Sequence, residues 1–107
     1  MNKFSAVKVL VVDDQPLIVD EISEFLEGSG YRCVSCYSSR EALERFRDDA
    51  EIAIVLCDLD MPGLNGIELV EAMKLLAGKT RIFESIMLTG QAEKQDVIKD
   101  LRAGIAD

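Results

Sequence analysis

Histidine and tryptophan are absent from this chain of 107 residues, and proline occurs only twice. Without histidine there is neither an imidazole acid-base catalyst nor any metal site that contains histidine. Positive charge is also scarce, since 12 basic residues stand against 20 acidic ones and the net charge is −8. A phosphate backbone attracts a basic surface, so we expect no nucleic acid to bind this domain.

Long hydrophobic runs are missing as well. A membrane-spanning helix needs about 20 predominantly apolar residues, and no run in this chain approaches that length. The apolar start of the chain leads directly into Asp13 and Asp14, with no signal-peptide cleavage region. We therefore expect a cytoplasmic protein of a single domain, with no membrane partner.

The three cysteines, Cys33, Cys36 and Cys57, suit a reducing compartment. Cys33 and Cys36 have the spacing of a C-x-x-C motif, but they lie in an alternating run at residues 31–37. Residues three apart on a strand point to opposite faces of the sheet. We therefore interpret these thiols as packing residues rather than as a redox or metal site.

Apolar patterns alternate between strand and helix along the whole chain. Runs rich in branched side chains predict four strands, at residues 7–12, 31–37, 52–57 and 81–88. Helical spacing follows each of these runs. A (βα)₄ succession is typical of an α/β fold, with helices on both faces of a parallel sheet. We predict a flavodoxin-like doubly wound sheet with the strand order 2-1-3-4.

Helix boundaries can be read from local signals. Pro16 suits the first turn of a helix, and the segment from Ser38 to Glu41 has the pattern of a capping box. Gly28, Gly78 and Gly104 are placed to end three of the four helices.

Acidic residues follow directly after two of the predicted strands. Parallel strands joined by right-handed crossovers end at the same edge of the sheet, where open α/β sheets bind ligands. In the predicted order this edge brings together Asp13, Asp14, Asp58 and Thr89, beside the small Gly90. Each of these residues alone is explained by an ordinary role in a cap, turn or loop. Their joint placement at neighbouring strand ends favours a ligand site.

The charge of this cluster indicates what it binds. Two like charges ~4 Å apart, at an effective dielectric constant of ~20, repel each other by about 4 kcal/mol. The fold must therefore either supply a cation or protonate one of the carboxyl groups. Oxygen ligands without histidine favour Mg²⁺, which keeps bound water that a phosphate can replace.

Four segments of the chain form recognisable motifs. They are VLVVDDQP at residues 9–16, VLCDLDMPGLNG at 55–66, IMLTGQ at 86–91 and LRAGIAD at 101–107. In this order and spacing they resemble the receiver domain of two-component response regulators, over essentially the whole chain. The pattern Asp-x-x-Met-Pro-Gly-x-x-Gly, which begins at Asp58, is a specific part of this resemblance.

The resemblance implies a phospho-accepting signalling domain rather than an enzyme with a separate substrate. Asp58 would accept a phosphoryl group from a histidine kinase or phosphotransfer protein and would also be a ligand of Mg²⁺. Asp14 would bind the metal directly, Asp13 through water, and Asp60 through its backbone carbonyl group. Thr89 would move to hydrogen-bond the phosphoryl oxygens and would shift the helix that follows. The side chain of Asp60 would lie near the phosphoryl group and affect dephosphorylation.

The resemblance also implies a departure at the end of the chain. The family pattern continues after a GIAD-like segment into a fifth strand, a Lys-Pro pair and a fifth helix, and these are missing here. We therefore expect residues 1–107 to be a receiver domain that is incomplete at its C-terminus, with an output domain beyond it. The family's phosphate-pairing lysine is absent, and we nominate no replacement from Lys79, Arg81, Lys94 and Lys99. The edge of the strand at 81–88 would then be exposed and would favour self-association.

Two other functions are considered on the sequence alone. Asp58 and Asp60 also resemble the Asp-x-Asp signature of haloacid-dehalogenase-type phosphatases, in which they would be the nucleophile and the acid-base residue. That signature belongs on the first strand of the sheet, however, and it leaves Asp13 and Asp14 unexplained. The other alternative is a pseudo-receiver, an interaction module that is not phosphorylated. The acidic site argues against it, whereas the missing lysine keeps it open.

Overall fold

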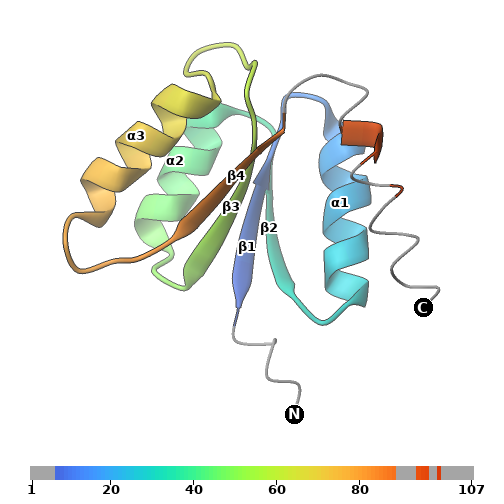
Figure 1. Ribbon diagram of the computed structural model, residues 1–107, viewed down its shortest axis with the longest axis horizontal. Coiled ribbons are helices and arrows are strands. Elements are labelled where there is room, and N and C mark those ends of the chain that lie inside the picture. Colours follow the sequence, from blue (N-terminus) through green and yellow to red (C-terminus); the bar gives the residue numbers. More distant parts are fainter. Residues whose placement is uncertain (1–6, 89–93, 97–98, 100–107) are drawn as a thin grey trace.

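The computed structural model describes residues 7–88, 94–96 and 99. The elements follow one another as β1 (Lys8–Val12), α1 (Pro16–Gly28), β2 (Arg32–Cys36), α2 (Ser39–Asp48), β3 (Ile52–Asp58), α3 (Gly66–Ala77) and β4 (Glu84–Leu88). All strand pairs are parallel, and the sheet has the order β2-β1-β3-β4. Figure 1 shows α1 on one face of the sheet and α2 and α3 on the other. The predicted flavodoxin-like sheet is confirmed.

The helix starts follow the predicted signals, with one addition. Pro16 begins α1, and the Ser38 side chain accepts a hydrogen bond from the Glu41 amide at the start of α2. The predicted capping box is only half formed, because the Glu41 carboxylate accepts from the Tyr37 amide, at 2.8 Å, rather than from the Ser38 amide. A complete capping box, which the sequence analysis did not identify, joins Asn65 and Glu68 at the start of α3. Of the predicted fourth helix, residues 94–96 and 99 are described and are helical, whereas Gly104 lies outside the described residues.

Strand β1 is buried on both faces, which is why its sequence is continuously apolar. Leu10 and Val12 belong to a hydrophobic cluster beneath α2 and α3, whereas Val9 and Val11 belong to a second cluster beneath α1. All four side chains are at most 2% exposed. This rigid central strand carries Asp13 at its end.

The cysteines pack as predicted. Cys33 lies on the α1 side of the sheet and Cys36 in the cluster beneath α2 and α3, so the two thiols face away from each other. Cys57 is also buried, and all three thiols are free. Burial raises the pKa of Cys36 and of Cys57 to about 12.

The fourth strand begins three residues later than predicted. Residues 81–83 are outside β4 because the Arg81 side chain is bound to the end of α2 and the start of β3. Its guanidinium group donates to the carbonyl oxygens of Phe46, Asp49 and Ile52, at 2.5, 2.7 and 3.2 Å. It also stacks on the Phe46 ring, 3.6 Å from the ring centroid. The expectation of a strand from Arg81 onward was therefore wrong.

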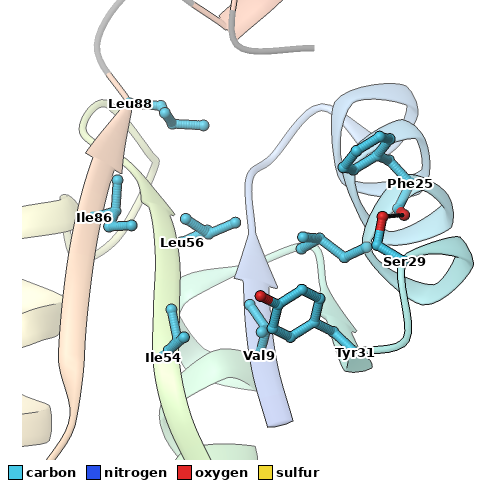
Figure 2. Close-up of a pocket in the computed structure, with 9 residues that line it drawn as sticks. Val9, Phe25, Ser29, Tyr31, Ile54, Leu56, Ile86 and Leu88 are labelled. Carbon is cyan, nitrogen blue, oxygen red and sulfur yellow. Dashed lines mark hydrogen bonds between the residues drawn. The ribbon is translucent and has the colours of Figure 1, made fainter. Parts of the chain in front are cut away.

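The α1 face of the sheet is covered only in part by the described residues. An apolar cavity of about 440 Å³ lies between α1 and the strands. Figure 2 shows the side chains that line it. Nine residues line it: Val9, Phe25, Leu26, Ser29, Tyr31, Ile54, Leu56, Ile86 and Leu88. Ile86 on the outer strand β4 is 51% exposed. In the part of the chain that the structure describes, no helix has the length and apolar character needed to cross a membrane.

Candidate functional site

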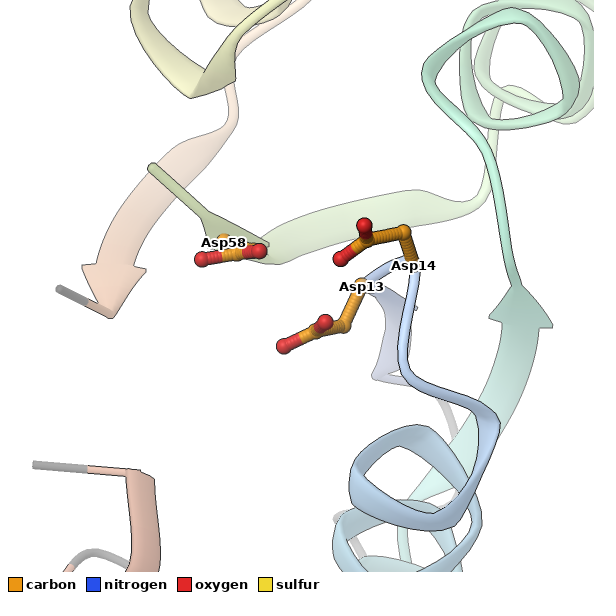
Figure 3. Close-up of side chains that lie close together, drawn as sticks. All are labelled: Asp13, Asp14 and Asp58. Atoms are coloured by element: carbon orange, nitrogen blue, oxygen red, sulfur yellow. The ribbon is translucent and has the colours of Figure 1, made fainter. Parts of the chain in front are cut away.

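Three carboxyl groups meet where β1 and β3 end. The two strands are neighbours, with Val12 paired with Cys57, so that Asp13 and Asp58 follow at the same edge of the sheet. Asp13, Asp14 and Asp58 each place an oxygen so that the three oxygens lie within 4.8 Å of one another. Figure 3 shows Asp58, from the end of β3, close to the two aspartates from the end of β1. The proximity predicted for these three residues is present.

The three side chains differ in their exposure. Asp13 and Asp58 are buried, at 2% and 3% exposed, whereas Asp14 is exposed to solvent. Burial raises the pKa of Asp58, and the neighbouring Asp13 raises it further, while a hydrogen bond from Lys94 works in the opposite direction. Two buried carboxyl groups this close need positive charge nearby in order to stay ionised.

Backbone amides orient the two buried carboxyl groups. The amide of Gln15 donates to Oδ1 of Asp13 at 2.9 Å, and the amide of Asp60 donates to Oδ1 of Asp58 at 3.3 Å. Asp is common in turns because its carboxylate accepts a bond from the amide two residues on. In this domain, the turns that end the two strands also fix the direction of their carboxyl groups.

The loop after β3 returns tightly to the strand. The Gly66 amide donates to the carbonyl oxygen of Leu59 at 2.8 Å. On the other side, the hydroxyl group of Ser39, at the start of α2, accepts from the Leu64 amide at 3.2 Å. Gly63 takes a φ of 80°, a conformation that favours glycine. The Gly/Pro loop therefore holds Asp60, which is exposed, close to the end of β3.

Thr89 and Gly90 lie outside the described residues. The residue before them is Leu88, which is the register partner of Asp58 and accepts a hydrogen bond from the Leu59 amide at 3.0 Å. The described end of β4 is therefore beside Asp58, as the strand order predicted.

Lys94 also reaches the acidic cluster, and the sequence analysis did not nominate it as a site residue. Its Nζ atom lies 2.8 Å from Oδ2 of Asp13 and 3.0 Å from Oδ1 of Asp58. Burial alone would lower the pKa of Lys94, but its bonds to Asp13 and Asp58 outweigh burial and raise the pKa. The sequence analysis nominated no lysine because none falls at a strand end, and Lys94 reaches the two carboxylates from the segment beyond β4 instead. Helical periodicity shows which face a lysine occupies, but not where the end of its long, flexible side chain lies.

A model of the response regulator receiver domain matches residues 9–107. This chain belongs to the response regulator receiver domain family. It is 46% identical over 99 residues to the two-component response regulator PprB of Pseudomonas aeruginosa, covering 92% of this chain and 36% of that protein. The chain therefore spans little more than a third of that relative's length.

Solved structures of receiver domains share the fold. A receiver domain protein from Clostridium thermocellum is 29% identical, with a TM-score of 0.72 over 92% of this chain and 76% of that one. The chemotaxis protein CheY4 of Vibrio cholerae is 30% identical, with a TM-score of 0.70 over 89% of this chain and 79% of that one. As a receiver domain, this chain is a signal-transduction module of a two-component system.

The donor set of the acidic cluster fits a hard divalent cation. All three candidate ligands are carboxylates, which Mg²⁺ prefers to nitrogen or sulfur. The nearby thiol of Cys57 is directed to the backbone oxygen of Asp58, at 3.3 Å, rather than to the carboxyl groups. The residues present are therefore suited to hold Mg²⁺.

Proposed function

We propose that this receiver domain accepts a phosphoryl group on Asp58, in a Mg²⁺-dependent transfer from a histidine kinase or phosphotransfer protein. The observation that supports this most strongly is the position of Asp58. It is a buried carboxylate at a rigid strand end, within 4.8 Å of two further carboxylates. Such a cluster suits a metal-assisted attack by an aspartate oxygen on phosphorus.

Each carboxylate has its own part in this proposal. A carboxylate oxygen of Asp58 forms the new bond to phosphorus, while the bond from phosphorus to the donor breaks and its electron pair leaves with the donor. Asp14, which is exposed, would bind Mg²⁺ directly, and Asp13 would bind it through water. The backbone carbonyl of Asp60 would be a further ligand. When bound, Mg²⁺ would supply positive charge to neutralise the transferring group.

We assign Thr89 and Gly90 to the phosphoryl group as well. The register pair of Asp58 and Leu88 supports this assignment, because residue 89 directly follows the strand end beside Asp58. The hydroxyl of Thr89 would donate to a phosphoryl oxygen, and Gly90 would leave space for that approach. Phosphorylation would in this way reach the segment that follows β4.

The family assignment gives no support to a haloacid-dehalogenase-type phosphatase. Asp58 ends the third strand along the chain rather than the first, and the side chain of Asp60 is exposed. A pseudo-receiver that is not phosphorylated is the alternative that experiment must separate from the proposal.

Binding of beryllium trifluoride, a mimic of a phosphoryl group, tests the proposal. In fluorine NMR with Mg²⁺ and BeF₃⁻, we expect a protein-bound signal for the wild type and none for Asp58→Asn. Asp48→Asn is the matched control, since Asp48 is exposed at the end of α2 and pairs with Arg47. It should bind like the wild type. No bound signal in the wild type would indicate a pseudo-receiver, and a signal in Asp58→Asn would place the acceptor elsewhere.

A further inference from the structure

Among the residues that the structure describes, Lys94 is the one buried cation, at 3% exposed. Its ammonium group bridges two strand ends through Asp13 Oδ2 at 2.8 Å and Asp58 Oδ1 at 3.0 Å. The Asp13 oxygen has no other partner in the described part of the chain. The lysine belongs to the helical segment at 94–96, beyond β4, and it reaches back into the acidic cluster.

We infer that Lys94 is an internal counter-cation of the acidic cluster and that a divalent cation binds there in competition with it. This inference rests on the metal site of the proposed function. It deepens that proposal because it identifies the residue that sets how tightly the domain binds metal.

The occupied oxygen atoms are the first reason for competition. Asp13 already uses Oδ1 for the Gln15 amide and Oδ2 for Lys94. Oδ1 of Asp58 is shared by the Asp60 amide and Lys94. A metal ion or its bound water gains these oxygens most directly by replacing the ammonium group, since the amides belong to the turns that end the strands.

Charge is the second reason. Mg²⁺ binds carboxylate oxygens at about 2.0–2.1 Å. An ion on these carboxylates would therefore lie close to an ammonium group that is 2.8 and 3.0 Å from the same two residues. Repulsion between the two cations in a site with little water opposes their simultaneous presence. The long stem of lysine allows the ammonium group to move away without unfolding the sheet.

Titration calorimetry with Mg²⁺ tests the competition. Lys94→Met keeps most of the side chain and removes its charge. If Lys94 leaves its partners free only about one-tenth of the time, removing it tightens the apparent dissociation constant about tenfold. Lys74→Met is the matched control, because Lys74 is exposed on α3 and the change in net charge is the same. We expect the dissociation constant of the control for Mg²⁺ to stay within about twofold of that of the wild type, because salt screens the effect of an exposed charge.

Thermal unfolding in the presence of a chelator provides the second readout. Without metal, Lys94→Met leaves the carboxylates uncompensated, so its Tm should fall by about 4 °C or more relative to Lys74→Met. Mg²⁺ should remove most of this difference. If the variant does not fold in the chelator, its affinity for Mg²⁺ is measured from the Mg²⁺ concentration at which it refolds. A variant that folds only with Mg²⁺ supports the inference.

The outcomes separate this inference from the proposed function. Equal Mg²⁺ affinity, or weaker affinity, in Lys94→Met overturns the competition and leaves phosphoryl acceptance by Asp58 intact. If neither the wild type nor Lys94→Met binds Mg²⁺, the metal site and the competition are both overturned. If Lys94→Met binds Mg²⁺ more tightly than the wild type but neither protein forms a BeF₃⁻ adduct, the competition is supported and the proposed function is contradicted.

Discussion

Gly66 packs so closely against Asp58 that a Cβ atom at position 66 would lie 2.5 Å from the Asp58 carbonyl oxygen. The same atom would lie 3.0 Å from Cα of Leu59. Both neighbours are backbone atoms, which cannot rotate aside as a flexible side chain can. The start of α3 therefore closes the loop directly behind the proposed phospho-acceptor, and only glycine fits there.

Gly66→Ala should lower the free energy of unfolding by about 1–3 kcal/mol, the usual cost of an added methyl group in a packed site. Urea unfolding of the purified chain measures this. Gly28→Ala is the control, since a Cβ atom at position 28 has nothing within 4 Å, and it should be neutral or slightly stabilising. Equal stability of Gly66→Ala and the wild type would show that the close approach is not required.

Arg81→Met should be more costly than the loss of an ordinary surface charge. Arg81 satisfies carbonyl oxygens at the end of α2 and the start of β3, and hydrogen bonds to charged groups contribute about 1.5–3 kcal/mol each. We expect a loss of roughly 2–4 kcal/mol in urea unfolding, because some of these carbonyls regain water. The exposed Lys79 supplies the control Lys79→Met. A loss no larger than that of the control would contradict this role.

The buried thiols should weaken the fold at high pH. The pKa of Cys36 is raised from 9.0 to about 12 in the folded chain. The unfolded chain therefore loses this proton first, and the stabilising effect, complete below pH 9.0, is lost as pH rises toward about 12. Between about pH 8 and about pH 10, the ionisation of this thiol in the unfolded chain should lower the free energy of unfolding by about 1.4 kcal/mol.

Urea unfolding of the wild type and of Cys36→Ala at these two pH values measures this loss of free energy. Between the two pH values the free energy of unfolding should fall less in the variant than in the wild type, whatever the stability of the variant at the lower pH. An identical decline in the two proteins would mean that Cys36 ionises equally well in the folded chain.

Asp60 is proposed to act on the phosphorylated state. Its side chain is exposed, and its amide donates to Asp58, so we propose that the carboxylate can assist an attacking water. We expect Asp60→Asn to lengthen the lifetime of phospho-Asp58 by roughly threefold or more, as for loss of a weak general base. Decay is followed by intact mass after removal of the phosphoryl donor, with Asp48→Asn as the control. An unchanged lifetime would exclude Asp60 from dephosphorylation.

We propose that the outer edge of β4 pairs with a second copy of this chain. Among the described strands β4 pairs only with β3, and its first three residues are exposed. Ile82 and Ile86, at 87% and 51% exposed, add apolar surface to this edge. Light scattering should show dimers for the wild type and monomers for Ile86→Lys, since charge blocks edge pairing. A stable wild-type monomer at high concentration would contradict this.

The sheet order and the meeting of the three carboxylates could be predicted from sequence because both depend on strong, local patterns. Continuous apolar runs such as that of β1 indicate a strand covered on both faces, and crossover handedness then brings Asp13 and Asp58 to one edge. The beginning of β4 could not be predicted in the same way. The run from Arg81 looks like a strand, but a bond from its guanidinium group to distant carbonyls overrides that local preference.

Lys94 could not be placed from sequence for a different reason. Its position depends on the path of the chain after β4 and on the attraction of two buried carboxylates, neither of which leaves a periodic signal. The Asn65–Glu68 capping box, in contrast, has a recognisable local pattern. Asn65, followed three residues later by Glu68 at the start of an apolar helical run, is enough to predict where α3 begins.

The most direct test of phosphoryl acceptance is the intact mass of the chain after incubation with acetyl phosphate, with and without Mg²⁺. We predict the gain of one phosphoryl group only when Mg²⁺ is present, with peptide mapping placing it on Asp58 and no gain in Asp58→Asn. A phosphoryl group on another residue, equal labelling in a chelator, or no labelling of the wild type would contradict it.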